Sequence, residues 1–210
     1  MERCYQIKID YSQCIDDFMT VHKLNDSDVD LTHLLNSSER DFNQEYIYAR
    51  ANLRHIVNFD FIANDLKIPI LSKKFVEVAQ ISSNHDFDLV DLVLLDDTYQ
   101  GELFSAEGNP NEGVEKLEGF STINFKVQRA LCDVENSTFM KLRSQPDSPG
   151  LLRKVVLRYP EEGFPPIFRI KESISMLFVS QSLKERLEEN TIKGCLFNEV
   201  TISNNSKQNS

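Results

Sequence analysis

Two short stretches of the 210-residue chain share one order of residue types: Ile70–Glu77, which reads ILSKKFVE, and Phe178–Glu185, which reads FVSQSLKE. In each stretch two apolar residues precede a serine, and an apolar residue and a glutamate follow it at the same spacing. A serine in this place accepts a hydrogen bond from an N–H group in the first turn of a helix. Both stretches therefore predict a strand that ends at a serine and a helix that begins directly after it.

These serines have a second interpretation, as nucleophiles exposed at a sharp turn. Such a nucleophile needs flanking glycines, as in G-x-S-x-G, and no glycine flanks Ser72 or Ser180. We therefore interpret both serines as helix caps. In the second stretch Ser182 and Glu185 also fit a capping box, and Gly194 lies where a helix would end.

Further elements follow from the spacing of apolar residues and from breakers. The predicted strands are residues 3–11, 70–71, 89–95, 122–125, 128–132, 152–159 and 167–170. Helix is predicted for residues 73–80 and for most of residues 12–65, including a short piece at 30–35 and residues 47–56, where apolar residues recur at helical spacing. Residues 97–119 hold four of the seven glycines and predict a hairpin or an extended loop, and residues 160–166 predict a turn because they hold three prolines.

The order of these elements predicts an α+β fold with a mixed or largely antiparallel sheet and packed helices, the N-terminal part being more helical. We expect one domain over residues 1–202, in which residues 1–65 form a helical extension packed on the core of residues 66–202. Residues 203–210 are polar throughout and predict a disordered tail.

The composition is that of an acidic globular protein. With 33 Asp and Glu against 23 Lys and Arg, the formal net charge is −10, while 40% apolar and 27% charged residues exclude wholesale disorder. Such an acidic balance disfavours a general nucleic-acid binder, because neutralising phosphates requires a basic surface. The sequence lacks an apolar run of about 18 residues and a signal-peptide pattern at its start, so we expect a cytoplasmic protein that does not associate with a membrane.

No motif for a metal or a cofactor stands out, and we predict neither. The cysteines are scattered and form no C-x-x-C pair, which favours reduced thiols: Cys4, Cys14, Cys132 and Cys195. The four histidines form no H-x-x-x-H pair. Residues 26–30 begin like a calcium loop, but Leu31 stands where that loop needs glycine and Ser37 where it needs glutamate. Glycine-rich phosphate-binding motifs are absent as well.

The net charge is concentrated in one quarter of the chain. Residues 75–125 hold eleven acids and one base, a net of −10, whereas the other residues hold 22 of each and cancel. This segment is either a solvated face or a docking surface for a basic partner, which its field would attract. The candidate contact residues are the acids from residue 86 onward and two aromatic anchors: Asp86, Asp88, Asp91, Asp96, Asp97, Tyr99, Glu102, Phe104, Glu107, Glu112, Glu115 and Glu118.

Several blocks from about residue 66 onward resemble one known family. They are Pro69–Ser72 before a helix, Thr122–Phe125 with Asp133 and Ser137 downstream, and then Ile167–Lys171, Leu177–Lys184 and Thr191–Phe197. In this order they are similar to the immunity proteins of bacterial polymorphic toxin systems, which are encoded beside a secreted toxin. The first 65 residues show no such similarity.

The resemblance implies a protein that binds and neutralises a cognate toxin domain without catalysis. From the charge distribution we hypothesise that residues 84–118 make or border the toxin contact and fill a basic active cleft, as expected for a toxin that is a nuclease or a nucleotide-targeting enzyme. Two alternatives remain open. One is a small hydrolase or transferase with an acidic site around residues 86–97, and the other is an acidic adaptor that mimics nucleic acid.

Overall fold

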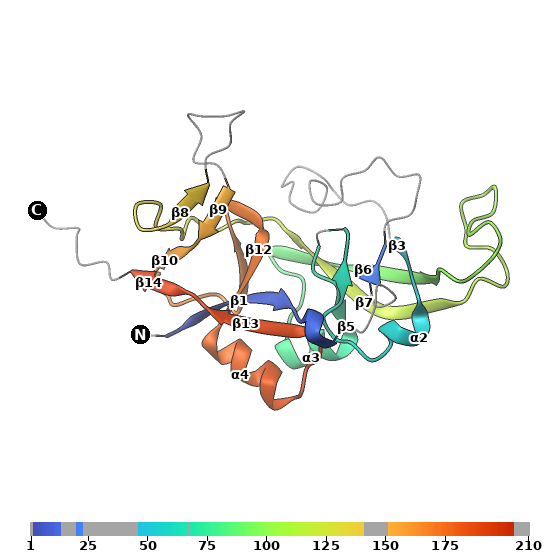
Figure 1. Ribbon diagram of the computed structural model, residues 1–210, viewed down its shortest axis with the longest axis horizontal. Helices are drawn as coiled ribbons and strands as arrows, with labels where there is room; N and C mark the ends of the chain where they lie inside the picture. Colours follow the sequence, from blue (N-terminus) through green and yellow to red (C-terminus); the bar gives the residue numbers. More distant parts are fainter. Residues whose placement is uncertain (1, 14–19, 23–45, 67, 141–150, 204–210) are drawn as a thin grey trace, which may run out of the picture.

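The computed structural model describes residues 2–13, 20–22, 46–66, 68–140 and 151–203 (Figure 1). Strands make up 45% of the structure, and helix only 14%, in short pieces. The expectation of an α+β fold with a more helical N-terminal part is therefore wrong: the described part of the chain is largely β. The expected helical piece at residues 30–35 and the expected tail at 204–210 lie outside the described residues.

One four-stranded sheet, here called the terminal sheet, brings the two ends of the chain together. Its order is β11 (Ile167–Ile170), β12 (Ser173–Ser180), β1 (Cys4–Ile9) and β13 (Cys195–Glu199), and each neighbouring pair is antiparallel. The strand predicted at residues 3–11 is thus confirmed as β1, and it lies inside this sheet. Within β1, Ile7 pairs with Leu177 on one side and with Phe197 on the other.

A second four-stranded sheet, the ribbon sheet, contains the two longest strands. Its order is β3 (Tyr46–Ala51), β6 (Phe87–Asp96), β7 (Lys116–Phe125) and β5 (Leu71–Ser72). β6 and β7 pair antiparallel over most of their length, and β3 runs parallel to β6. In the second half of β6 the side chains of residues 92–95 are buried on both faces of the sheet, which agrees with the continuous apolar run in this part of the strand.

Shorter elements complete the structure. They are the 3-10 turn η1 (Tyr11–Gln13), β2 (Thr20–Val21), α2 (Leu53–Ile56), β4 (Ala63–Asn64), α3 (Lys73–Ala79), β8 (Thr138–Met140), β9 (Leu151–Lys154), β10 (Val156–Arg158), α4 (Gln181–Glu189) and β14 (Thr201–Ser203). Two-stranded pairs form between β2 and β4, β8 and β9, and β10 and β14. Helices α3 and α4 contact each other and lie beneath the sheets in Figure 1.

Both predicted helix caps are confirmed. The Ser72 hydroxyl accepts a hydrogen bond from the Phe75 N–H at 3.0 Å, and the Ser180 hydroxyl accepts one from the Leu183 N–H at 3.3 Å. The capping box at Ser182 is wrong, because α4 begins at residue 181 with Ser180 as its cap. The same helix ends at residue 189, five residues before the glycine expected at its end, and that glycine instead directly precedes β13.

The largest correction concerns residues 47–56. Their first half is strand β3, in which Ile47, Ala49 and Ala51 are buried and the residues between them are less so. Apolar residues at these positions fit a period of two as well as a helical period. Pairing with β6 stabilises residues 46–51 as a strand rather than a helix, and only residues 53–56 form helix α2.

Two other predictions differ from the structure. Residues 128–132 form no strand, only isolated bridges at Arg129 and Cys132. Residues 152–159 divide between β9 and β10. The turn at residues 160–166 is confirmed, and the positive φ of 82° at Gly163 is one that glycine adopts readily.

The main hydrophobic core lies between the two sheets and the helices. It unites terminal-sheet residues such as Tyr5 and Val179 with ribbon-sheet residues such as Ile123 and with Leu183 of α4. Separate clusters fill the space between β3, β6 and α2, and the space beneath β9, β10 and the turn at residues 160–166. The two sheets are therefore packed into one body, which positions a cavity at their junction.

Asp60 ties the segment before β5 to the segment before β13. Its carboxylate accepts hydrogen bonds from the Ser72 hydroxyl at 2.7 Å and from the Lys193 N–H at 3.0 Å, and Lys74 Nζ lies 3.7 Å away. The Lys193 carbonyl in turn accepts hydrogen bonds from the N–H groups of Asp60 and Phe61. This buried network fixes the distance between the sheets at one point.

None of the helices among the described residues has the length and apolar character needed to cross a membrane.

Candidate functional site

The acidic segment forms an ordered loop at the far end of the β6–β7 ribbon, drawn at the right of Figure 1. We call residues 96–118 the ribbon loop; this range includes the last residue of β6 and the first three residues of β7. Backbone hydrogen bonds hold it: the Ser105 N–H donates to the Asn109 carbonyl at 2.8 Å, and the Asn111 N–H donates to the Leu103 carbonyl at 2.9 Å. The Asn111 side chain also donates to the carbonyl of Glu102 at 2.7 Å. The predicted loop over 97–119 is thus confirmed up to residue 115, and β7 begins at the next residue.

A small hydrophobic cluster supports the ribbon loop from below. Buried Leu95 and Val114 pack with the half-buried ring of Phe104, which meets Tyr48 of β3 edge-to-face at 5.4 Å. The ring of Tyr99 lies so close to Gly101 that a Cβ there would stand 2.8 Å from it, so a larger residue would displace this ring. Phe104 and Tyr99, the two predicted anchors, are therefore packed into the loop itself and present only part of their surface.

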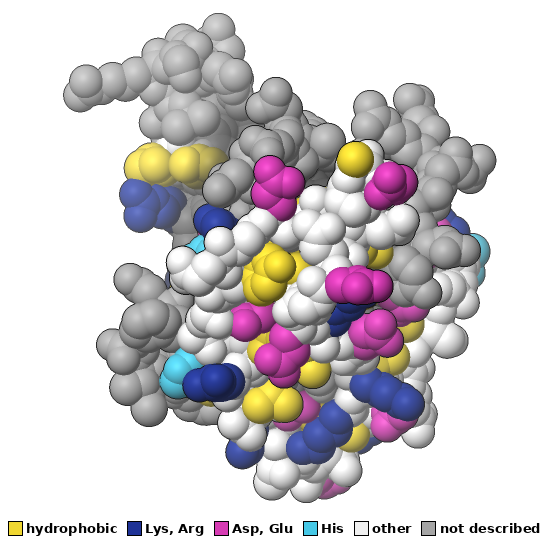
Figure 2. Space-filling view, turned by 90° about the vertical axis from the view of Figure 1, so that its right-hand side faces the viewer, with side chains coloured by type: hydrophobic (Ala, Val, Ile, Leu, Met, Phe, Trp, Pro, Cys, Tyr) yellow, Lys and Arg dark blue, Asp and Glu magenta, His cyan; other side chains and the backbone are white. Residues whose placement is uncertain are grey.

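Most of the acidic side chains of the ribbon loop are exposed to solvent. Seven acids and one lysine between residues 96 and 118 give a net charge of −6. Figure 2 shows acidic side chains gathered across this end of the molecule with hydrophobic side chains among them. Within the described residues none of the seven acids forms an ion pair. The six that are exposed are Asp97, Glu102, Glu107, Glu112, Glu115 and Glu118.

Asp96 and the three acids nearest the start of β6 have structural partners. Asp96 accepts hydrogen bonds from the Thr98 N–H and hydroxyl, which closes the first turn of the loop. Asp86 forms an ion pair with Arg129, and Asp88 forms one with Lys126 at 2.7 Å. The fourth, Asp91, is exposed on β6 and accepts a hydrogen bond from the Ser121 hydroxyl at 3.3 Å. The ten candidate acids thus divide into three groups: two that are paired with a cation near the base of the ribbon, two that only accept hydrogen bonds, Asp91 and Asp96, and the six exposed acids of the loop, which form no ion pair among the described residues.

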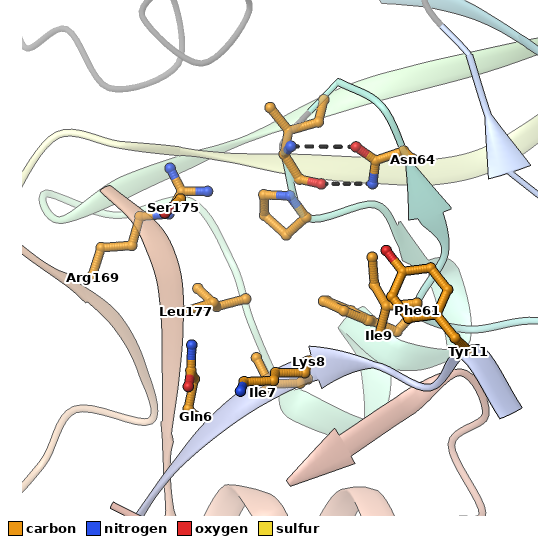
Figure 3. Close-up of a pocket in the computed structure, with 12 residues that line it drawn as sticks. Gln6, Ile7, Lys8, Ile9, Tyr11, Phe61, Asn64, Arg169, Ser175 and Leu177 are labelled. Atoms are coloured by element: carbon orange, nitrogen blue, oxygen red, sulfur yellow. Dashed lines mark hydrogen bonds between the residues drawn. The ribbon is translucent and has the colours of Figure 1, made fainter. Parts of the chain in front are cut away.

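A cavity of about 450 Å³ opens at the junction of the two sheets (Figure 3). We call it the junction cavity. Buried Ile7, Phe61 and Leu177 form part of its wall. At its rim lie the exposed side chains of Lys8 and of Tyr11, the latter 67% exposed.

Arg169 is the one buried cation among the residues that line this cavity. It is only 2% exposed and comes from β11, whose four residues are all buried. Its guanidinium carbon stands 4.9 Å from the ring centre of Phe125, which belongs to the other sheet. Burial lowers the pKa of Arg169 to about 10, so the side chain stays charged at neutral pH. In Figure 3 Arg169 and Ser175 lie on one side of the cavity, and Phe61, Ile9 and Tyr11 lie on the opposite side.

No sequence pattern predicted this cavity, although one signal was present. Arg169 interrupts the apolar run Ile167–Ile170, and a charge inside a buried strand usually has a partner or a function. Its cavity neighbours come from β1, from residues 61–69 and from β12, which are far apart in the chain. Periodicity cannot join such distant segments.

The thiols and histidines supply no reactive cluster within the described part of the chain. Burial raises the pKa of Cys4 and of Cys195 to about 12 and also raises that of Cys132, so these thiols are protonated at neutral pH. Among the described residues no three His, Cys, Asp or Glu side chains gather as metal ligands would. The calcium-like start at residues 26–30 lies outside the described residues.

Comparison with known proteins adds no family: no protein-family model and no curated protein matches this chain.

Proposed function

We propose that this protein binds a basic partner through the ribbon loop, and that the partner is a cognate bacterial toxin domain whose active cleft the loop occupies. The observation that carries the proposal is the set of six exposed acids, free of ion pairs among the described residues, on a loop that is ordered by its own hydrogen bonds. In this proposal the protein acts in the cytoplasm of the cell that produces the toxin, and it acts by binding alone.

The order of the loop matters for this function. A loop that is already folded loses little conformational entropy on binding, which favours a long-lived complex. The cluster around Phe104 and Tyr48 provides that order, and it places the exposed acids on a rigid support. The exposed parts of the Tyr99 and Phe104 rings add apolar surface beside these acids, and partly exposed aromatic rings of this kind are typical anchors in protein interfaces.

The charge distribution favours a basic cleft as the target. Unpaired carboxylates would replace the phosphates of a nucleic acid or nucleotide substrate, and a net charge of −6 on one loop would speed the encounter. Asp86 and Asp88 are paired with Arg129 and Lys126, so they are less suited to this role or to an acidic catalytic site. The adaptor that mimics nucleic acid would use the same loop, and it differs in binding several basic proteins where an immunity protein binds one.

The test is growth rescue by co-expression with the toxin domain encoded in the neighbouring reading frame. One variant reverses four loop charges, Asp97→Lys, Glu102→Lys, Glu112→Lys and Glu115→Lys. The control reverses four exposed acids elsewhere, Glu135→Lys, Glu161→Lys, Glu162→Lys and Glu189→Lys, so that the total charge is the same. We expect the wild type and the control to rescue growth and the loop variant to fail.

The association rate gives a second measurement. Added salt should slow the association of the wild type and the control, whereas the loop variant should associate about 10–1,000-fold more slowly at low salt and respond weakly to salt. Equal rescue and equal rates for the two variants would refute the proposal. Binding of many unrelated basic proteins with similar affinity would favour the adaptor instead.

A further inference from the structure

Strand β13 forms an open edge of the terminal sheet (Figure 1). The Val200 N–H donates to the Cys4 carbonyl at 2.9 Å, and residues along an antiparallel pair alternate between bonding to the partner strand and facing away from it. The backbone groups of Cys195, Phe197 and Glu199 therefore face away from β1. Within the described chain no hydrogen bond reaches these groups, so they are available to a further strand.

The other outer strands of the two four-stranded sheets are covered. Isolated bridges join Arg129 to β11, His22 to β3 and Phe61 to β5 on their outer sides. β13 also lacks the usual protection of an open edge, because residues 195–199 contain no proline, no lysine and no bulge. An unprotected edge of this kind is a place where an extended segment of another chain can add as a strand.

The open edge is short and is closed at one end. The Lys193 carbonyl accepts hydrogen bonds from the Asp60 N–H at 3.1 Å and the Phe61 N–H at 3.0 Å, so these two residues lie where an added strand would continue. At the other end β14 follows Val200 and pairs with β10 instead of β1. A second copy paired through β13 would run on past Lys193 and meet Asp60 and Phe61. A short segment of a different protein, paired along the five residues of β13, would not.

A pocket of about 170 Å³ beside this edge has unpaired positive charge. We call it the edge pocket. Asn198 and Glu199 of β13 line it together with Arg153 and Lys154 of β9. The side chains of Arg153 and Lys154 are exposed and form no ion pair among the described residues, whereas Glu199 is paired with Arg3 at 3.6 Å. In an added strand the side chain opposite Asn198 would lie on the same face and nearest to the pocket, and the two cations favour a carboxylate there.

The remaining positions of the edge favour apolar side chains. Cys195 and Phe197 are half-buried and pack against the main hydrophobic core. Apolar side chains placed opposite them would cover the parts that are still exposed. Leu196 is 48% exposed on the face that holds Asn198, so an apolar side chain opposite it would also gain contact.

We propose that β13 is a docking edge for an extended segment of a partner protein. The segment pairs antiparallel with residues 195–199, carries an acidic side chain opposite Asn198, and carries apolar side chains opposite Phe197 and Leu196. This site is separate from the ribbon loop, and it does not depend on the toxin that we propose for that loop.

The probe is the peptide Thr-Glu-Val-Leu-Val-Thr, blocked at both ends with a fluorescent label, whose binding to the full-length protein is followed by fluorescence anisotropy. The peptide with glutamine in place of glutamate should bind at least about tenfold more weakly, because it lacks the charge that the edge pocket attracts. A methyl group on the nitrogen of the first valine removes the N–H that would donate to the Phe197 carbonyl, and should also weaken binding at least about tenfold. A methyl group on the leucine nitrogen is the matched control, because that N–H would point away from β13, and it should change the affinity little.

Substitutions locate the acidic side chain. Arg153→Gln with Lys154→Gln should lower the affinity for the glutamate peptide to that of the glutamine peptide, and should leave binding of the glutamine peptide unchanged. Arg54→Gln with Lys171→Gln removes two exposed charges elsewhere and should bind both peptides as the wild type does.

The same measurements can overturn the proposal. Absence of saturable binding up to about 1 mM peptide, or equal binding of the two methylated peptides, would exclude pairing at β13. Equal affinities for the glutamate and glutamine peptides would exclude the acidic side chain at the edge pocket. Sedimentation of the protein alone should show no dimer, and a dimer that the peptide dissociates would identify a second copy as the occupant of the edge and refute the partner segment.

Discussion

Gly194 stands where the segment after α4 passes closest to the segment before β5. Its φ is +91°, and a Cβ at this position would lie 2.1 Å from the carbonyl oxygen of Phe61. That oxygen belongs to backbone that is itself held in place, because the Phe61 N–H donates to the Lys193 carbonyl at 3.0 Å. The Gly194 carbonyl also accepts a hydrogen bond from the Asp10 N–H at 2.9 Å. The substitution Gly194→Ala therefore tests whether this close approach is as tight as the structure shows.

The expected loss of stability has two parts. Alanine at a positive φ destabilises by about 1–2 kcal/mol. Moving the two backbone segments apart by more than an ångström would weaken up to three hydrogen bonds that join them, two to the Lys193 carbonyl and one from the Lys193 N–H to the Asp60 carboxylate, each contributing about 1 kcal/mol. The sum is about 3–5 kcal/mol, which for a chain of this size corresponds to a fall in Tm of about 6–20 °C.

Gly108 provides a matched control. Its φ is +80°, but nothing lies within 4 Å of the position that a Cβ would take. Gly108→Ala should therefore lose only the conformational part, about 1–2 kcal/mol. Urea unfolding followed by circular dichroism measures both variants, with the slope of the transition checked against the wild type. If Gly194→Ala loses no more stability than Gly108→Ala, the close contact at Phe61 is not real and the reasoning fails.

Three further predictions concern buried polar groups. Asp60→Asn should destabilise by about 2–3 kcal/mol in urea unfolding, because it removes the buried charge that accepts from the Lys193 N–H and the Ser72 hydroxyl and that faces Lys74; exposed Asp97→Asn should change little. In a background with Cys14→Ser and Cys195→Ser, buried Cys4 and Cys132 should react with a disulfide reagent only as fast as the protein unfolds, because burial shields each thiol and raises its pKa; a fast reaction at pH 8 would contradict their burial. Hydrogen bonds from Asn136 and Ser203 lower the pKa of Asp133 below its ordinary value of 3.8, so the stabilisation by this carboxylate is present above pH 4 and is lost as the pH falls through the lowered pKa. Asp133→Asn should therefore be less stable than the wild type at pH 7, and the difference in stability should shrink in acid. A difference in stability that does not depend on pH would exclude this origin.

Several features of this protein could be predicted from the sequence because they depend on neighbouring residues. A serine cap requires only a hydroxyl and an N–H three residues later, so the starts of α3 and α4 were correctly placed at Ser72 and Ser180. Glycines and prolines marked the ribbon loop and the turn at residues 160–166 in the same way. The segregation of charge is also a property of the sequence alone, and the structure adds which acids have partners.

Other features depend on contacts between distant residues, and the sequence pattern was ambiguous or silent there. Residues 47–51 fit a helix and a strand equally well, and β6, some forty residues later, supplies the hydrogen-bond partners that make them a strand. Residue 7 pairs with residues 177 and 197, a closure that no local preference encodes. The junction cavity has the same origin: β1, β11 and residues 61–69 line it only because the two sheets pack together, and that packing places the charge of Arg169 beside an apolar wall. Local hydrogen bonds and backbone preferences are thus written in the sequence, whereas strand partners and cavities are set by which distant surfaces bury each other.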